Sequence, residues 1–244
     1  MKVIPVIDVL NGVAVHGIRG ERKRYQPLKS LLCNSAEHPL AIASAFDSLG
    51  FSSLYLADLD AILKNSANFH IYKQIVTNTG LDLMVDAGIA DVTKAEDVLN
   101  AGVSRIVVGS ETLASLDFLG HVIKAFGADK VVVSIDLKEG KLLSASEAIA
   151  AMDAVSFAQE LCKIGVNQII VLDLGRVGTE HGINLPLLKA ILEKTGVEIL
   201  VGGGIRSLQE LEQLRKLGVS GALVATILHN GKLDVDDLKS AGFL

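Results

Sequence analysis

The 244-residue sequence predicts an α/β fold, a (βα)8 TIM barrel made of two similar half-barrels. Eight short apolar runs alternate with longer amphipathic segments, as expected for parallel strands that are buried on both faces and covered by helices. Motifs of the first half also recur in the second half. Eight βα units in about 240 residues suit a closed barrel. A doubly wound open sheet is the alternative architecture.

The apolar runs give the expected strands in chain order. They are Val3–Asp8, Ser53–Asp58, Leu81–Asp86, Arg105–Gly109, Lys130–Asp136, Gln168–Asp173, Glu198–Gly202 and Gly221–Ala225. Between the last two, SLQELEQLRKL repeats leucine at helical spacing. Glycines follow the amphipathic segments and are expected to end helices in the left-handed conformation. These are Gly50, Gly80, Gly102, Gly165, Gly196 and Gly218.

An internal duplication supports the barrel. VIPVIDVLNG resembles VVVSIDLKEG, and LYLADLDAI resembles IIVLDLGRV. LDLMVDAGIADVTKAEDVLNAG resembles VEILVGGGIRSLQELEQLRKLG, which aligns Gly88 with Gly204 at an offset of 116 residues. A long repeat at a constant offset indicates fused structural units. No linker separates the halves, so we expect a single domain over residues 1–244.

Bulk properties exclude several classes of protein. The net charge is −5 and no basic stripe is present, so we expect no nucleic-acid partner. No apolar run is long enough for a membrane helix, and we expect a cytoplasmic protein. Cys33 and Cys162 are expected to be reduced thiols. We predict no metal site and no cofactor, since His38, His70, His121 and His229 lack the spacing of metal ligands. Aspartates could still hold Mg²⁺. Homo-oligomerisation and a glutaminase partner are left open.

The strongest local motif is the turn Gly202-Gly203-Gly204-Ile205-Arg206-Ser207. It follows a strand and opens a helix, where free N–H groups and the helix dipole favour an anion. We predict that a phosphate binds at Gly203 and Gly204, and that Ala225 and Thr226 of the next βα turn complete the cradle. The alternative is a tight turn that needs glycine for its geometry alone.

Five predicted strands end in aspartate, and in a parallel barrel these ends meet at one rim. Crowded carboxylates raise one another's pKa, which suits acid and base catalysis near neutrality. We predict catalytic roles for three of these residues and substrate contacts for the other two. The alternative is that individual aspartates cap helices or form ion pairs. The catalytic candidates are Asp8, Asp136 and Asp173, and the substrate-binding candidates are Asp58 and Asp86.

Two loops carry the remaining candidates. His16 and Arg19 lie in the first βα loop, just before the basic run Arg22–Arg24. Such a loop suits an anionic substrate, although a solvated charged loop is equally consistent with this composition. His181 lies in the loop after the sixth strand and is expected to be exposed.

The chain resembles the histidine-biosynthesis barrel family. That family contains the phosphoribosylformimino-aminoimidazole-carboxamide ribotide (ProFAR) isomerase and the imidazole glycerol phosphate synthase cyclase. The resemblance covers essentially the whole chain, through IPVIDVLNGVAVHG, YLADLDAI, IVVGSETL, VVVSIDLKEGK, RVGTEHGIN and VGGGIRS. It implies a substrate with a phosphate at each end and an Amadori aldose-to-ketose rearrangement, with Asp8 as general base. It also matches Asp136 to the family's fifth-strand aspartate, and Gly203, Gly204 and Arg206 to the second phosphate motif.

The chain departs from the family pattern at catalytic and binding positions. The family's loop after the sixth strand reads Asp-Gly-Thr, and its aspartate is the general acid. Here Gly178 and Thr179 are kept as substrate-binding candidates, but Val177 replaces the acid. The first phosphate motif, Gly-Gly-Gly-Ile-Arg in the isomerase, here reads Asp86-Ala87-Gly88-Ile89-Ala90. The family's Gly-Trp after the fifth strand is missing, Leu172 replaces a usual threonine, and His16 stands at the cyclase's lysine.

Three functions are therefore weighed. The first is an isomerase or related lyase that acts on a small phosphorylated metabolite by aspartate acid/base chemistry. The second is a genuine ProFAR isomerase in which another aspartate replaces the lost acid. The third is a non-catalytic phosphometabolite-binding or regulatory barrel.

Overall fold

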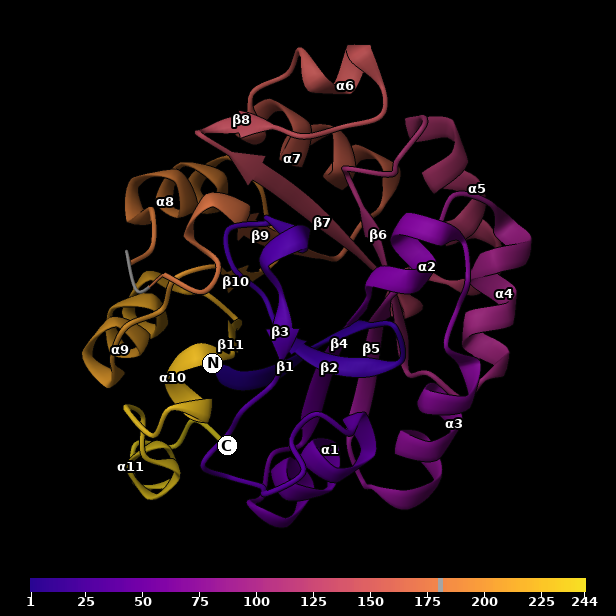
Figure 1. The fold of residues 1–244 in the computed structure, drawn as a ribbon. Helices are drawn as coiled ribbons and strands as arrows, with labels where there is room; N and C mark the ends of the chain where they lie inside the picture. Colours follow the sequence, from indigo (N-terminus) through magenta and orange to yellow (C-terminus); the bar gives the residue numbers. More distant parts are fainter. Residues whose placement is uncertain (180–181) are drawn as a thin grey trace.

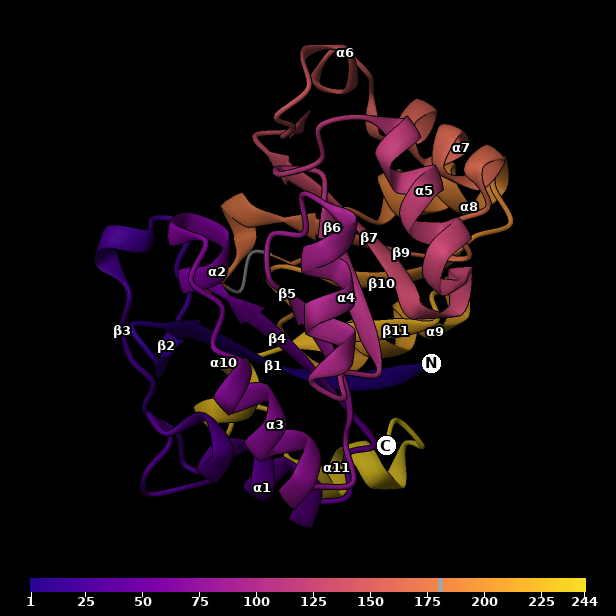
Figure 2. The same ribbon diagram turned by 90° about the vertical axis from the view of Figure 1, so that its right-hand side faces the viewer.

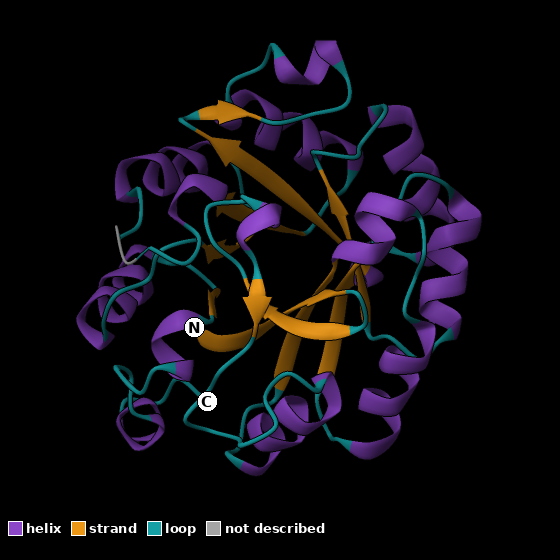
Figure 3. Ribbon diagram, viewed as in Figure 1, coloured by secondary structure: helices purple, strands orange, loops and turns teal. Residues whose placement is uncertain are grey.

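The computed structural model describes residues 1–179 and 182–244. Eight parallel strands form the barrel, and pairing of β11 with β1 closes it through Lys2↔Gly221 to Pro5↔Val224. The strands lie at the centre of a ring of helices (Figures 1 and 3). They are β1 (Lys2–Leu10), β4 (Ser53–Asp58), β5 (Asp82–Asp86), β6 (Arg105–Gly109), β7 (Val131–Lys138), β9 (Gln168–Asp173), β10 (Glu198–Gly202) and β11 (Gly221–Val224). The predicted (βα)8 barrel is confirmed.

Helices cover the outside of the sheet, as the view from the side shows (Figure 2). The longer ones are α1 (Pro39–Ser48), α3 (Phe69–Asn78), α4 (Val92–Asn100), α5 (Leu116–Phe126), α7 (Ala154–Ile164), α8 (Leu185–Lys194) and α9 (Leu208–Leu217). Shorter helices are α2 (Leu59–Lys64), α6 (Glu147–Ala150), α10 (Thr226–His229) and α11 (Val235–Ser240). No helix in the described part of the chain has the length and apolar character needed to cross a membrane.

Two hairpins extend strands beyond the rim. β1 continues into β2 (Val13–His16), which pairs with β3 (Gln26–Pro27), and β7 continues into β8 (Lys141–Leu142). Asn11 and Gly12 turn the first hairpin with φ of 54° and 74°, and Glu139 and Gly140 turn the second with 53° and 76°. Two successive positive φ values match the right-handed twist of the flanking strands. The expected first loop is therefore partly a hairpin.

Side-chain alternation along the strands separates two cores. Residues from one face of the strands fill the barrel interior, including Ile4, Met84, Val107, Ile170 and Leu200. The other face packs against the helices in a larger core. This filled interior forms the floor beneath the rim, because inward side chains of a parallel barrel stack in layers.

Four of the six glycines expected to end helices adopt the left-handed conformation. Gly50, Gly102, Gly165 and Gly218 have φ of 93°, 91°, 95° and 98°. Gly80 and Gly196 do not have positive φ, because the residues that cap α3 and α8, Thr79 and Thr195, are already in extended conformation. The two exceptions lie at the same place in the two halves.

Candidate active site

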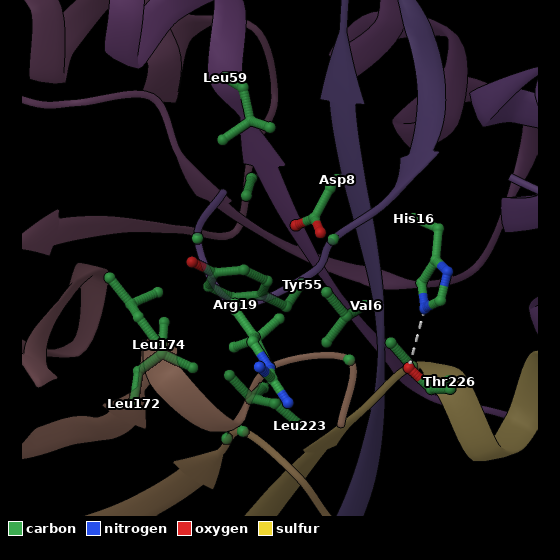
Figure 4. A pocket seen from close by; sticks show the side chains of 18 of the residues that line it. Val6, Asp8, His16, Arg19, Tyr55, Leu59, Leu172, Leu174, Leu223 and Thr226 are labelled. Carbon is green, nitrogen blue, oxygen red and sulfur yellow. Dashed lines mark hydrogen bonds between the residues drawn. The ribbon is translucent and has the colours of Figure 1, made fainter. Parts of the chain in front are cut away.

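A cavity of about 240 Å³ lies at the carboxyl ends of the barrel strands. Figure 4 shows Asp8, His16, Arg19, Tyr55 and Thr226 around it. Eleven of the fourteen predicted site residues line this cavity: Asp8, His16, Arg19, Asp86, Asp136, Gly178, Thr179, Gly203, Gly204, Ala225 and Thr226. The rim topology thus brings together residues that are more than 200 positions apart in the chain, such as Asp8 and Thr226.

Asp8 lies on β1 beneath the first loop. Burial raises the pKa of its carboxyl to about 7, although the Arg22 guanidinium acts in the opposite direction. A methyl group on Gly17 would lie 2.4 Å from Asp8 Oδ2, so only glycine lets the loop pass this close to the carboxylate. Among the described residues no hydrogen-bond donor pairs with the Asp8 side chain. Its carboxylate is therefore available to a ligand.

Asp86 and Asp136 converge over Gly109. A methyl group on Gly109 would lie 3.2 Å from Asp136 Oδ2 and 3.5 Å from Asp86 Oδ2. Asp86 Oδ1 accepts a hydrogen bond from Gly88 N at 3.0 Å. Asp136 Oδ1 accepts from Ser134 Oγ at 2.6 Å, and its Oδ2 accepts from Glu111 N at 3.3 Å. Burial raises the pKa of Asp86 to about 7 and that of Asp136 to about 6.

Tyr55 adds a buried phenol to this acidic end. Burial, and then the negative charges of Asp86, Asp136 and Asp8, hold its pKa well above the usual value. The phenol is therefore neutral at physiological pH and can donate a hydrogen bond.

The opposite end of the cavity carries the glycine turn. Gly203 and Gly204 have φ of 95° and 87°. A methyl group on Gly203 would lie 2.5 Å from the Asp173 carbonyl oxygen, and one on Gly204 would lie 3.1 Å from Arg176 Cβ. The turn thus needs glycine both for its conformation and for close packing. Helix α10 begins beside it at Thr226, where the first N–H groups have no partner inside the helix.

His16 joins the first hairpin to this end. Its Nε2 lies 3.2 Å from Thr226 Oγ1, the contact drawn as a dashed line in Figure 4. Burial lowers the pKa of the His16 imidazole. In the absence of an anion the ring therefore favours its neutral form, in which it can donate to or accept from the Thr226 hydroxyl.

The predicted substrate contact of Asp58 and the predicted catalytic role of Asp173 need correction, because neither side chain lines the cavity. Strand register explains this: Asp8 pairs with Ala57, which pairs with Asp86, so these three lie in one layer. Asp58 follows Ala57 by one residue and therefore points to the opposite face. Likewise Asp136 pairs with Leu172, which lines the cavity, and Asp173 lies one position further.

Both displaced aspartates have structural partners. Asp58 is fully buried and caps α2 by accepting from Ala61 N at 3.0 Å. It also accepts from Asn68 N, Asn68 Nδ2 and the Tyr72 hydroxyl. Asp173 accepts from Gly175 N at 3.1 Å and pairs with Arg176 Nε at 2.9 Å. The alternative, that individual aspartates cap helices or form ion pairs, therefore describes these two residues.

Arg206 is the third predicted residue that does not line the cavity. Its guanidinium is exposed and lies 3.3 Å from the buried Glu210 carboxylate. Glu210 also accepts from Arg206 N at 2.9 Å and from Ile183 N at 3.0 Å. This ion pair ties the glycine turn to α9, so Arg206 supports the cradle from outside. The expectation for His181 lies outside the described residues.

An ion pair that the sequence did not predict joins two loops at the cavity. Arg22 Nη2 donates to both oxygens of Glu111, at 3.0 Å and 2.9 Å, and joins the first loop to the loop after β6. Arg22 and Glu111 line the cavity, as do Tyr55 and Lys138. The basic run Arg22–Arg24 indicated that the first loop is positively charged. No local pattern in the sequence, however, pairs Arg22 with a residue 89 positions away.

Within residues 1–179 and 182–244, no group of three or more His, Cys, Asp or Glu side chains is arranged to hold a metal ion. The cavity instead combines three carboxylates of raised pKa with a glycine turn suited to an anion. Such an arrangement can move protons on an anchored anionic molecule.

The fold and the site place the protein in the class of (βα)8 barrels, in which many enzymes carry their active site at the carboxyl ends of the strands. A family model described as "Histidine biosynthesis protein" matches residues 2–234. The chain therefore belongs to this family.

Similar proteins cover the chain almost end to end. An uncharacterized protein of Methanocaldococcus jannaschii is 36% identical over 98% of this chain and 97% of its own length. Two proteins named 1-(5-phosphoribosyl)-5-((5-phosphoribosylamino)methylideneamino)imidazole-4-carboxamide isomerase are also similar. The one from Streptococcus thermophilus is 32% identical over 99% of this chain and 100% of its own length. The one from Lachnoclostridium phytofermentans is 30% identical over 97% of each.

Proposed function

We propose that the protein is an isomerase that resembles ProFAR isomerase and acts on a small phosphorylated substrate, a sugar phosphate or ribotide. The observation that carries this proposal is the single cavity in which Asp8 and Asp136, both of raised pKa, face the Gly203–Gly204 turn. Relatives named as isomerases of a phosphoribosyl compound support the same reaction class.

In the proposed reaction the glycine turn, Ala225 and Thr226 anchor a phosphate. The Asp8 carboxylate removes a proton from the carbon next to the aldose carbon, and the electron pair forms an enol or enolamine. Asp136, in its protonated form, donates a proton to the oxygen or nitrogen on the aldose carbon as this pair moves. Asp8 then returns its proton to the former aldose carbon while Asp136 takes the proton of the neighbouring hydroxyl, so the ketose forms and both carboxyls return to their starting states. Burial is the main cause of the raised pKa of both groups, and it allows each to exchange a proton near neutrality.

In this mechanism Asp136 donates the proton that the family's acid after the sixth strand would otherwise donate. Val177 lines the cavity there and cannot transfer a proton. Asp173 is engaged with Arg176 outside the cavity, which removes it from the proposed mechanism. The assignment of Asp136 thus follows from the positions of the two candidates.

Asp8→Asn tests the catalytic part of the proposal. The amide keeps the shape of the side chain but cannot accept a proton, so we expect turnover to fall by about 10²–10⁴-fold. Binding of inorganic phosphate, measured by calorimetry, should change less than about threefold. Asp173→Asn is the matched control and should keep turnover. Phosphate binding without turnover of any phosphorylated sugar or ribotide by the native protein would instead support a non-catalytic binding barrel.

Genuine ProFAR isomerisation is the second candidate, favoured by the names of the relatives. Two observations weigh against it: Val177 in place of the acid, and Asp86 at the first phosphate motif. A carboxylate 4 Å from a phosphate costs about 1–4 kcal/mol per unit charge, depending on the effective dielectric constant. Growth of a histidine auxotroph that lacks ProFAR isomerase, with this protein expressed at native level, would establish the second candidate over the first.

A further inference from the structure

The duplication provides an internal comparison between the two ends of the cavity. At the offset of 116 residues, Gly88 corresponds to Gly204 and Asp86 to Gly202. At the same offset Glu111 corresponds to Ile227. The first-half turns therefore stand where the second half builds its glycine cradle. Differences between these equivalent positions show what each end of the cavity can bind.

The N–H groups of the first-half turns already bond to carboxylates of the protein. Gly88 N donates to Asp86 Oδ1 at 3.0 Å, and Glu111 N donates to Asp136 Oδ2 at 3.3 Å. Among the described residues, no side chain accepts from the equivalent Gly204 N or Ile227 N. A phosphate at the first-half end would have to displace two carboxylates and then lie beside them. The first-half end is thus closed to phosphate by both hydrogen bonding and charge.

The first-half turn also has a different backbone. Gly203 and Gly204 both have positive φ, whereas in the first half only Gly88 does, with φ of 62°. Ala87 is fully buried at the position of Gly203, and Ala90 stands at the position of Arg206. The cradle geometry and its supporting arginine are both missing from the first half.

Among the described residues no basic side chain forms a salt bridge with Asp86, although the Arg22 guanidinium acts to lower its pKa. Arg22 is held by Glu111 through two hydrogen bonds. Arg19 and Lys138 line the cavity, but within the described chain no salt bridge joins Asp86 or Asp136 to a basic side chain. Because residue 109 is glycine, space remains in front of the two carboxylates, where a Cβ would otherwise contact both. A positively charged group in this space would match the charge of the two carboxylates.

We infer that the substrate carries one phosphate, bound at the Gly203–Gly204 turn, and at its other end a cationic nitrogen group that pairs with Asp86 over Gly109. This inference rests on the proposed function, because it takes the glycine turn as the phosphate site. The substrate class is then an amino-substituted phosphate monoester rather than a bisphosphate. The phenol of Tyr55 lies beside Asp86 and can donate a hydrogen bond to the same end.

A cation on Asp86 is compatible with proton donation by Asp136. The pKa of Asp136 is raised mainly by its own burial, and Asp86 is not among the main causes of this shift. Neutralising Asp86 therefore leaves Asp136 able to hold a proton. The two neighbouring carboxylates would have separate roles, one in binding and the other in proton transfer.

Four phosphate esters built on the same four-carbon chain test the inference: 4-aminobutyl phosphate, butyl phosphate, 4-hydroxybutyl phosphate and butane-1,4-diyl bisphosphate. Calorimetry of the full chain should give at least tenfold tighter binding of the amine than of butyl phosphate, and at least tenfold tighter than of the bisphosphate. Tighter binding of the bisphosphate or of the hydroxyl compound than of the amine would overturn the inference.

Variants locate the preference. Asp86→Asn keeps the acceptor for Gly88 N and should reduce the preference for the amine below about threefold while butyl phosphate binds as before. Asp82→Asn, an exposed aspartate on the same strand, is the control and should keep the preference. The triple variant Asp86→Gly, Ala87→Gly, Ala90→Arg copies the second-half motif and should bind the bisphosphate at least tenfold more tightly than the native chain does. A preference that survives Asp86→Asn would overturn the assignment of Asp86.

The same measurements separate this inference from the proposed function. If neither inorganic phosphate nor any of the monoesters binds the native protein, the phosphate site fails and the proposed function fails with it. If the monoesters bind and compete with inorganic phosphate, but without preference for the amine, only the cationic end is wrong.

Discussion

The aspartates at the strand ends have different environments, although the topology places all of them at the same rim of the barrel. Asp8, Asp86 and Asp136 lie in the layer that faces the cavity, whereas Asp58 and Asp173 lie one residue beyond it. Because strand side chains alternate between faces, a shift of one residue separates a carboxylate that can meet a ligand from one that caps a helix. The difference between the aspartates that line the cavity and those that do not therefore arises from strand register.

Burying carboxylates at the cavity should cost stability at high pH. The pKa of Asp86 is raised from 3.8 to about 7, so between these values the folded state binds a proton that the unfolded state does not. Stability contributed by this group is thus highest at low pH and falls as pH rises through about 7. We expect the gain in unfolding free energy on Asp86→Asn to be about 1–3 kcal/mol larger at pH 8 than at pH 5.

Urea denaturation at the two pH values measures this difference, with Asp82→Asn as the control on the same strand. The amide can keep the hydrogen bond from Gly88 N, so loss of the charge is the main change at this position. A variant less stable than the native protein at pH 8 would show that the Asp86 carboxylate is stabilising in the folded state, contrary to its raised pKa.

At the scale of elements, the sequence predicted each barrel strand because strands buried on both faces are continuous apolar runs. The β1–β2 and β7–β8 hairpins were missed, although Asn11-Gly12 is a strong turn signal between alternating residues. The reach of Arg22 to Glu111 could not be predicted, since it depends on how two loops from different strands meet above the barrel. Local pattern determines elements, whereas contacts between loops need the assembled fold.

The short helix α2 and the start of α3 depend on Asp58. Its buried carboxylate accepts from Ala61 N, Asn68 N, Asn68 Nδ2 and the Tyr72 hydroxyl. Removing it leaves these donors without their acceptor, and each unsatisfied buried donor costs about 1–3 kcal/mol. We expect Asp58→Ala to lower the unfolding free energy by about 3–5 kcal/mol.

Chemical denaturation of Asp91→Ala provides the comparison for Asp58→Ala. Asp91 caps α4 through one exposed bond to Lys94 N, so its loss should cost only about 1 kcal/mol. Similar losses in the two variants would contradict a special structural role for Asp58.

The loops after β2 and β9 meet above Asp8. Arg19 N donates to the Val177 carbonyl oxygen at 2.9 Å, and a methyl group on Gly178 would lie 2.3 Å from the Gly17 carbonyl oxygen. We expect Gly178→Ala to push the loops apart, to speed hydrogen exchange of the Arg19 amide at least tenfold and to lower turnover. Gly140→Ala is the matched control: its φ is also positive, at 76°, but its Cβ would meet nothing within 4 Å. Unchanged Arg19 exchange in Gly178→Ala would show that the loops can yield without separating.

At the scale of the whole molecule, the duplicated halves share a fold but differ in charge. The second half contributes the glycine cradle, and the first half contributes Asp8 and the acidic turn at Asp86. Asp136, from the second half, lies over Gly109 of the first. The cavity is therefore asymmetric although the barrel is nearly symmetric, and a reaction that needs both Asp8 and Asp136 needs both halves.

Separate halves test this dependence. If the chain is divided between Gly127 and Ala128, each separate fragment lacks its partners in the β6–β7 and β11–β1 pairings. Each four-stranded fragment then has two open edges. Unpaired edges promote association, so size-exclusion chromatography should show that fragments 1–127 and 128–244 each self-associate when expressed alone. Co-expressed, they should pair through both lost edges and elute at the size of the intact chain. Because the proposed phosphate site lies wholly within the second fragment and Asp8 within the first, neither fragment alone should turn over substrate, whereas the pair should. Turnover by fragment 128–244 alone would remove Asp8 from the mechanism and place the proton transfer entirely in the second half.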